Sequence, residues 1–258
     1  MILEDKVFVL IDNLKINYEE EGNGKPLILL HGWKNDLEIW NGIVPLLNDY
    51  RVIRLDLPGF GKSDLPPRAW NVSDYAEFLN KFLEKLNIPK IVLIGHSFGG
   101  RIVIKFSVLY PEKVSKLTLV DSGGVRLKNL RKFFAFILAK LGKVFWLLPF
   151  IREKRDEIRE KFYKALKAKD YLEKNRILRE TFLKVIKEDL RGESQQIKIP
   201  TLIIWGGKDF ITLLKEGKIL KQSIKNSRLE IIKDATHWPF LEKEKEFLEI
   251  LRRFLENK

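Results

Sequence analysis

Short runs of continuous apolar residues recur along the chain and alternate with segments whose apolar residues are three or four positions apart. Such a run is typical of a strand that is buried on both faces of a sheet. The runs cover residues 27–30, 52–55, 91–94, 117–120, 201–205 and 229–232. The three- and four-residue spacing predicts helices over residues 36–48, 72–86, 98–110, 212–224 and 241–256. Alternating strands and helices need crossover connections, so the pattern predicts an α/β fold with a mostly parallel sheet.

The N-terminal region has a different pattern. Residues 7–11 and 14–18 flank Asp12-Asn13, and each is rich in apolar residues. Two such segments around a two-residue polar turn predict a β-hairpin ahead of the parallel strands.

One interval, residues 124–195, lacks any strand pattern and interrupts the alternation. We interpret it as a helical insertion over a core domain made of residues 1–123 and 196–258. Its first part, residues 133–151, is very apolar, but Lys140 and Lys143 fall within it. A lysine at the centre of a bilayer costs about 3 kcal/mol, which disfavours a membrane span. Packing on the core is the favoured interpretation, and a peripheral membrane contact stays open.

The charge distribution bears on possible partners. The formal net charge is +13, and residues 126–195 hold 20 Lys and Arg against 10 Asp and Glu, which is a net +10. Apolar residues recur there at helical spacing instead of alternating with the basic ones, so we do not expect a nucleic-acid partner. A solvated face is the favoured interpretation of the charge, with attraction of carboxylate-bearing substrates as the alternative.

The absence of cysteine excludes a disulfide framework, a thiolate metal site and a cysteine nucleophile. The first residues have neither the basic region nor the apolar run of a signal peptide. Both observations favour a cytoplasmic protein. No pattern of residues indicates a metal site or requires a cofactor, and the oligomeric state is left open.

The strongest local motif is Gly95-His96-Ser97-Phe98-Gly99, between the predicted strand 91–94 and the helix that follows. A Gly-x-Ser-x-Gly sequence in this context predicts a sharp turn that exposes the serine in a strained conformation. The helix N-terminus beside it presents free N–H groups to developing negative charge. Ser97 is therefore the candidate nucleophile.

A serine hydroxyl needs a base, and the chain has only three histidines. His96 is next to Ser97 and is expected to point away from it, while His31 ends an early strand. His237 lies in a loop after the last predicted strand, at the carboxyl edge of the sheet. We expect His237 to be the base.

The base in turn needs a carboxylate that fixes its tautomer. Asp209 follows the strand 201–205 and is the favoured residue, and Asp121 is the alternative because it also follows a strand. An oxyanion would be held by two backbone N–H groups, which we assign to Phe98, after the nucleophile, and to Trp33, in the loop after strand 27–30.

Taken together, these motifs resemble the α/β-hydrolase superfamily over nearly the whole chain outside residues 124–195. They are the His31-Gly32 loop, the stretch 56–64, the Gly95–Gly100 turn, and the order Ser97, Asp209, His237. The resemblance implies an eight-stranded, mostly parallel sheet whose second strand is antiparallel, and a helical cap over residues 124–195. Haloalkane dehalogenases and epoxide hydrolases carry aspartate at the nucleophile, so Ser97 separates this chain from both.

The chemistry expected is acyl transfer to Ser97 followed by hydrolysis. A carboxylesterase for small or medium apolar esters is the favoured function. A carbon–carbon bond hydrolase, thioesterase, lactonase or aminopeptidase with the same residues is the alternative, and a non-catalytic ligand receptor or scaffold is a third possibility. Aromatic residues are candidates for the substrate pocket, with simple packing as their other interpretation: Trp33, Phe133, Phe134, Phe136, Phe145, Trp146 and Trp238.

Overall fold

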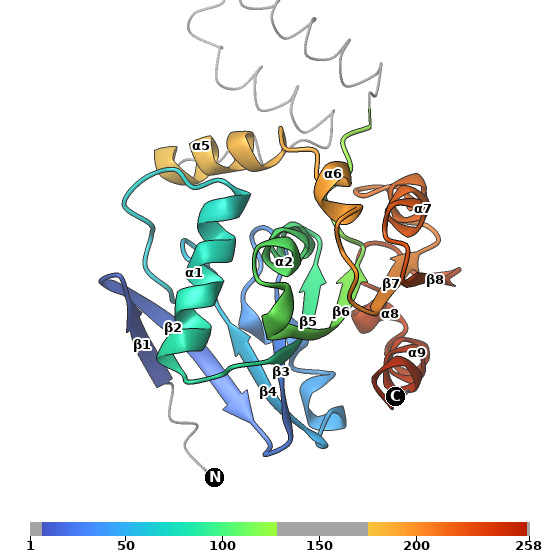
Figure 1. Cartoon of the computed structure of the whole chain (residues 1–258), viewed down its shortest axis with the longest axis horizontal. Coiled ribbons are helices and arrows are strands. Elements are labelled where there is room, and N and C mark those ends of the chain that lie inside the picture. The colour runs from blue at the N-terminus through green and yellow to red at the C-terminus, as the bar shows by residue number, and fades with distance from the viewer. Residues whose placement is uncertain (1–6, 128–174, 257–258) are drawn as a thin grey trace, which may run out of the picture.

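A twisted eight-stranded sheet forms the centre of the computed structural model, which describes residues 7–127 and 175–256 (Figure 1). Its strand order is β1-β2-β4-β3-β5-β6-β7-β8. The strands are β1 (Val7–Ile11), β2 (Leu14–Glu21), β3 (Lys25–Leu30), β4 (Tyr50–Leu55), β5 (Ile91–His96), β6 (Val114–Val120), β7 (Thr201–Gly206) and β8 (Ser227–Ile232). Strand β2 is antiparallel to both of its neighbours, and β3 to β8 are parallel. The predicted sheet and its antiparallel second strand are confirmed.

Helices connect the parallel strands, as the spacing of apolar residues predicts. The described α-helices are α1 (Val72–Lys85), α2 (Phe98–Leu109), α5 (Arg176–Val185), α6 (Arg191–Ser194), α7 (Leu214–Ser223), α8 (Pro239–Glu242) and α9 (Glu244–Glu256). Helix α1 starts at a capping box. The Asn71 side chain accepts the Asp74 N–H at 2.9 Å, and the Asp74 carboxylate accepts the Asn71 N–H at 2.7 Å. These bonds satisfy two of the backbone donors at that helix end.

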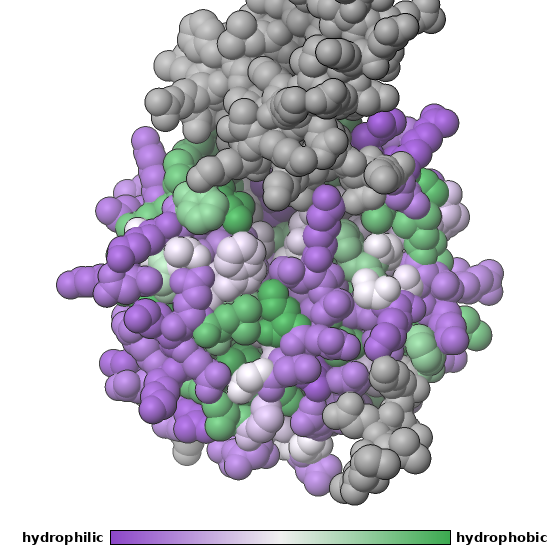
Figure 2. Space-filling view, turned by 180° about the vertical axis from the view of Figure 1, so that it is seen from behind, coloured by the Kyte–Doolittle hydropathy of each residue, from purple (hydrophilic) through white to green (hydrophobic). Residues whose placement is uncertain are grey.

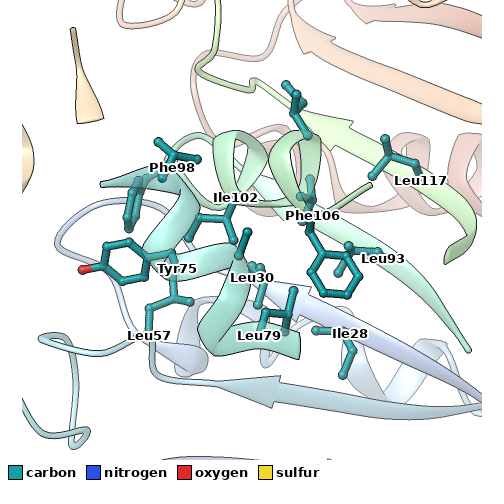
Figure 3. Close-up of a cluster of buried hydrophobic side chains, with 14 of the residues drawn as sticks. Ile28, Leu30, Leu57, Tyr75, Leu79, Leu93, Phe98, Ile102, Phe106 and Leu117 are labelled. Carbon is teal, nitrogen blue, oxygen red and sulfur yellow. The ribbon is translucent and has the colours of Figure 1, made fainter. Parts of the chain in front are cut away.

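Strands β3 to β7 are buried on both faces over most of their length, and alternate residues point to opposite layers of the core, whereas the edge strand β8 is only partly buried. In β3, Ile28 and Leu30 pack toward α1 and α2, whereas Leu27 and Leu29 pack toward α9. The first layer is seen in Figure 3, whose labelled side chains are Ile28, Leu30, Leu57, Tyr75, Leu79, Leu93, Phe98, Ile102, Phe106 and Leu117. Burial on both faces explains why these strands are continuous apolar runs.

Two of the predicted helices differ in the structure. Residues 36–48 form two short 3-10 helices, η1 (Leu37–Trp40) and η2 (Val44–Leu46), instead of one α-helix. Pro45 within the segment has no N–H and would clash with the carbonyl four residues earlier, which prevents a continuous helix. Residues 241–256 belong to α8 and α9, which are separated at Lys243, where the backbone leaves the helical region at φ −138° and ψ 51°.

The beginning and the end of the 124–195 segment lie next to each other on the core. The Leu190 N–H donates to the Gly124 carbonyl at 2.7 Å, so the chain returns beside the point where it leaves. Helix α5 is fixed to the loop before α1, because the Trp70 N–H donates to the Thr181 hydroxyl at 3.1 Å. The Val72 N–H donates to the Glu188 carboxylate at 2.9 Å.

The surface of the described residues is mostly hydrophilic. Figure 2 shows one face, on which hydrophobic side chains form smaller patches between hydrophilic ones. None of the helices in the described ranges is long and apolar enough to cross a membrane. The division into a core and an inserted cap remains a prediction.

Candidate active site

The turn between β5 and α2 holds Ser97 in a strained backbone conformation. Its φ is 51° and its ψ is −106°, values that non-glycine residues rarely adopt. Backbone bonds on both sides keep it there: the Ser97 N–H donates to Val120 at 3.0 Å, and the Ser97 carbonyl accepts from Gly123 at 2.9 Å. A sharp strand-to-helix turn of this kind raises a serine above the sheet edge.

The glycines of the Gly95–Gly99 motif allow this close packing. A Cβ at Gly95 would lie 2.5 Å from the Gly99 carbonyl oxygen, and one at Gly99 would lie 2.5 Å from the Leu30 carbonyl oxygen. Since real Cβ atoms do not approach backbone oxygens so closely, the turn needs glycine at both positions.

His237 lies in the loop between β8 and α8 and is buried. Its Nδ1 is 2.8 Å from Oδ2 of Asp209, which follows β7. Asp209 also accepts the N–H groups of Ile211 at 2.7 Å and Thr212 at 3.1 Å. Burial alone would raise the pKa of Asp209, but the hydrogen bonds from His237 and its other donors hold that pKa below its ordinary value. Asp209 is thus an ionised carboxylate that fixes the His237 ring.

Asp121, the alternative acid, is fully buried after β6. Its Oδ1 accepts the Gly206 N–H at 2.9 Å. In the described part of the chain, the carboxylate that hydrogen-bonds His237 is Asp209, and no such bond joins His237 to Asp121.

Ser97 is half-buried at the same carboxyl edge of the sheet as His237 and Asp209. Among the residues that the structure describes, no hydrogen bond reaches the Ser97 hydroxyl. Contacts between a nucleophile and its base are often long in a ligand-free site and shorten when substrate binds. The structure therefore pairs the predicted base with the predicted acid, and brings the predicted nucleophile to the same edge of the sheet.

The loop after β3 carries Trp33, one of the two expected oxyanion donors. His31 fixes this loop: its Nδ1 donates to the Gly32 carbonyl at 2.7 Å, and its Nε2 accepts the Leu57 N–H at 2.9 Å. Burial lowers the pKa of His31, which keeps the ring neutral and able to make both bonds. Among the described backbone hydrogen bonds of turns, loops and caps, none has the Trp33 or the Phe98 N–H as its donor.

Aromatic side chains surround this edge of the sheet. The Trp33 ring lies 4.8 Å from Phe60, 5.2 Å from Phe98 and 5.1 Å from Phe182, between ring centroids. Trp238 is half-buried, with its ring 5.2 Å from that of His237. The other predicted pocket residues lie outside the described part of the chain: Phe133, Phe134, Phe136, Phe145 and Trp146.

Comparison with known proteins settles the family. A family model described as the alpha/beta hydrolase fold matches residues 25–244. The chain belongs to the α/β-hydrolase family. The resemblance stated from the motifs is confirmed, and the protein is a hydrolase of this family.

Named relatives and solved structures extend over most of this α/β hydrolase. Lipase 1 of Psychrobacter immobilis is 28% identical over 255 residues, covering 93% of the chain and 80% of the lipase. The 2-hydroxy-6-oxononadienedioate/2-hydroxy-6-oxononatrienedioate hydrolase 1 of Pseudomonas putida is 31% identical over 252 residues, covering 88% of the chain and 86% of that hydrolase. An esterase from Exiguobacterium antarcticum has a TM-score of 0.78 at 24% identity, covering 98% of the chain and 100% of the esterase.

Two residues of this α/β hydrolase contact the candidate site in ways that the sequence does not predict. His96 is buried, its Nε2 donates to the His237 carbonyl at 2.8 Å, and its ring is 4.8 Å from that of His237. Burial and the neighbouring His237 hold the pKa of His96 well below its ordinary value, so His96 is neutral. The second is Phe182 of α5, which contacts Trp33. Neither contact has a local sequence signal, because each joins segments far apart in the chain.

Proposed function

We propose that this α/β hydrolase is a serine hydrolase, with Ser97 as nucleophile, His237 as general base and Asp209 as the carboxylate that orients the base. We further propose that its substrates are small or medium apolar carboxylic esters. The observation that carries the proposal is the 2.8 Å hydrogen bond between His237 and Asp209 at the sheet edge where Ser97 is held at positive φ.

In the acylation step, the Ser97 oxygen attacks the ester carbonyl carbon and its proton passes to Nε2 of His237. The negative charge that develops on the carbonyl oxygen is held by the N–H groups of Trp33 and Phe98. When the tetrahedral intermediate collapses, the bond to the alcohol breaks, and the alcohol oxygen takes the proton from His237.

In the deacylation step, His237 takes a proton from water, and the resulting hydroxide equivalent attacks the acyl carbon. Ser97 then leaves and recovers its proton from His237. Asp209 stays ionised throughout and stabilises the imidazolium.

The preference for apolar esters follows from the described surroundings of Ser97. Trp33 and Phe182 are half-buried rings at this edge, and the buried rings of Phe60 and Phe98 pack against Trp33. Such a surface favours apolar acyl or alcohol groups over charged ones. Similarity to a lipase supports the same substrate class.

A second candidate is hydrolysis of a carbon–carbon bond next to a carbonyl group. The relative from Pseudomonas putida, which is 31% identical, is named for oxo-dienedioate substrates. A substrate with two carboxylates would need cationic partners, whereas the described aromatic side chains around Trp33 are uncharged. Ester hydrolysis is therefore preferred.

The test is covalent labelling with a fluorophosphonate, followed by peptide mass spectrometry. We expect the label on Ser97, and its loss in Ser97→Ala and His237→Ala. Ser107→Ala is a matched control, because Ser107 lies buried in the same helix α2 with no described hydrogen bond, and this variant should label fully. Ser97→Ala should abolish turnover while its thermal unfolding stays cooperative.

Esters of one chromogenic alcohol with acyl chains of graded length then test the substrate class. Turnover that is higher with short and medium acyl chains than with long ones supports the proposal. Turnover only with an oxo-diacid would favour the second candidate. Absence of both label and turnover in folded protein would contradict enzymatic function and favour a ligand receptor or scaffold.

A further inference from the structure

Two buried carboxyl groups meet beside His237. Asp121 follows β6 and Asp209 follows the neighbouring strand β7, so the pairing of these strands brings the two residues together. One oxygen of each carboxyl group and one nitrogen of His237 all lie within 4.8 Å of one another. Two buried carboxylates this close repel each other, which favours one proton shared between them or held by one of them.

The hydrogen-bond donors around Asp209 show that it carries the negative charge. It accepts two backbone N–H groups, from Ile211 at 2.7 Å and Thr212 at 3.1 Å. The Thr212 hydroxyl lies 2.6 Å from Oδ2, and His237 Nδ1 lies 2.8 Å from the same oxygen. Four donors of this kind stabilise an anion strongly.

Asp121 has a poorer set of partners. Its Oδ1 accepts one N–H, from Gly206 at 2.9 Å, and its Oδ2 is buried with no acceptor or donor role among the described bonds. The charged groups that act on it are both acidic, Asp209 and, from α8, Glu242. An ionised Asp121 would leave a buried, negatively charged oxygen without a donor, which is costly.

We propose that Asp121 is a neutral carboxylic acid whose Oδ2–H donates a hydrogen bond to the Asp209 carboxylate, making Asp121 a positioning residue for the His237–Asp209 pair. The positioning role of Asp121 in the reaction rests on the proposed function, whereas the location of the proton on Asp121 does not.

The electrostatic environment agrees with this geometry. Burial, and after it the hydrogen bond to Asp209, raise the pKa of Asp121 to about 10. The same bond is one of the interactions that lower the pKa of Asp209. The pair thus holds a single negative charge at neutral pH, and that charge is located on the residue that contacts His237.

The arrangement also limits the movement of Asp209. The Asp121 backbone is fixed by its N–H bond to the Ile204 carbonyl at 3.0 Å, so its side chain is anchored at both ends. The Thr212 hydroxyl, which contacts Asp209, also lies 3.0 Å from the Asp121 carbonyl oxygen. A donor on Asp121 is therefore a further restraint on Asp209, in addition to the donors from its own turn.

The direct test is infrared difference spectroscopy of the whole protein at neutral pH, comparing the wild type with Asp121→Asn. A protonated carboxylic acid has a carbonyl stretch that a carboxylate lacks. We expect this band in the wild type and its loss in Asp121→Asn, with full retention in Ser97→Ala. Absence of the band from the wild type would overturn the proposal, because it would mean that both carboxyl groups are ionised, for example around a bound cation.

Kinetics on the best ester then tests the positioning role. Asparagine keeps an acceptor for Gly206 and a neutral donor for Asp209, so Asp121→Asn should rescue kcat to within about threefold of the wild type. Leucine of similar size has neither group, and Asp121→Leu should lower kcat by at least about tenfold while KM changes little, since a lost hydrogen bond to a charge is worth about 1.5 kcal/mol or more. Its acid limb of activity should move to higher pH, because Asp209 loses a donor.

The two failures are distinguishable. If Asp121→Asn loses as much kcat as Asp121→Leu, the reaction needs the Asp121 carboxylate as an anion and the proposal is overturned. If the infrared band is present but Ser97 is never labelled, the proton on Asp121 is supported and the proposed hydrolase function is contradicted.

Discussion

At the scale of single residues, the number of hydrogen-bond donors decides which of two adjacent carboxyl groups is ionised. Asp209 has four donors and Asp121 has one from the backbone, so identical side chains have opposite pKa shifts. The difference comes from the backbone after each strand. The turn after Asp209 directs N–H groups at its own side chain, and the turn after Asp121 does not.

This difference makes stability depend on pH in a specific way. An unfolded aspartate ionises near pH 3.9, whereas folded Asp121 keeps its proton up to a pKa of about 10. Between those values the folded state binds one more proton than the unfolded state, so this group lowers stability as the pH rises, by at most about 1.4 kcal/mol per pH unit.

Asp121→Asn removes this proton and hence the dependence. We expect the variant to gain stability relative to the wild type, and the gain to grow steadily from pH 5 to pH 9. Urea denaturation of both proteins at several pH values measures it, and other titrating groups cancel in the difference. A gain that stays constant with pH would contradict the protonated form.

The sequence predicts Ser97, His237 and Asp209 as site residues because each has a local signal: a glycine motif, or a loop after an apolar run. It does not identify His96 as a partner of the His237 backbone, or Asp121 as a partner of Asp209. Those contacts depend on the order β5-β6-β7-β8 in the sheet, and adjacency of strands is not encoded in periodicity.

At the scale of elements, the close approach of α2 to β3 positions the turn that holds Ser97. Gly99 is the residue that permits it, as a Cβ there would lie 2.5 Å from the Leu30 carbonyl oxygen. We expect Gly99→Ala to lower the free energy of unfolding by about 1–3 kcal/mol, because the backbone must move to relieve the clash.

Gly192 in α6 is the matched control for this substitution. A Cβ added there meets nothing within 4 Å, so Gly192→Ala should stabilise the protein by up to about 1 kcal/mol through helix propensity. Chemical denaturation measures both variants. Similar changes of the same sign in the two variants would show that close packing at Gly99 has no role.

The elements were predictable where their apolar pattern is long and uninterrupted, as in α1 and α2. The elements were not predictable where a short segment is held by side chains from distant parts of the chain. In residues 36–48, the Leu37 N–H donates to the Asp56 carboxylate at 2.8 Å, and Pro45 starts a second turn. The apolar spacing there reflects burial of two short turns rather than one helix.

At the scale of the whole molecule, α9 closes the second layer of the core together with η1, η2 and α8. Phe247 and Leu251 are fully buried against β7 and its neighbours. We expect Phe247→Ala to lower the free energy of unfolding by about 3–5 kcal/mol, the range for a fully buried aromatic residue. Leu241 is 51% exposed, and Leu241→Ala should change it by less than about 0.5 kcal/mol.

Thermal and urea unfolding monitored by circular dichroism compares these two variants with the wild type. Equal stability of the two variants would mean that α9 contributes little to folding. The class of the molecule followed from its continuous apolar runs. The strand order, in which β4 lies between β2 and β3, depends on long-range pairing that the runs do not specify.

The strained conformation of Ser97 has a consequence for attempts to improve this protein. A non-glycine residue at such backbone angles costs of order 1–3 kcal/mol, and glycine would adopt the same angles without that cost. Engineering that ranks variants only by resistance to heat would therefore enrich glycine at position 97 and discard the hydroxyl. Under the proposed function, thermal stability and turnover would be selected in opposite directions at this one position.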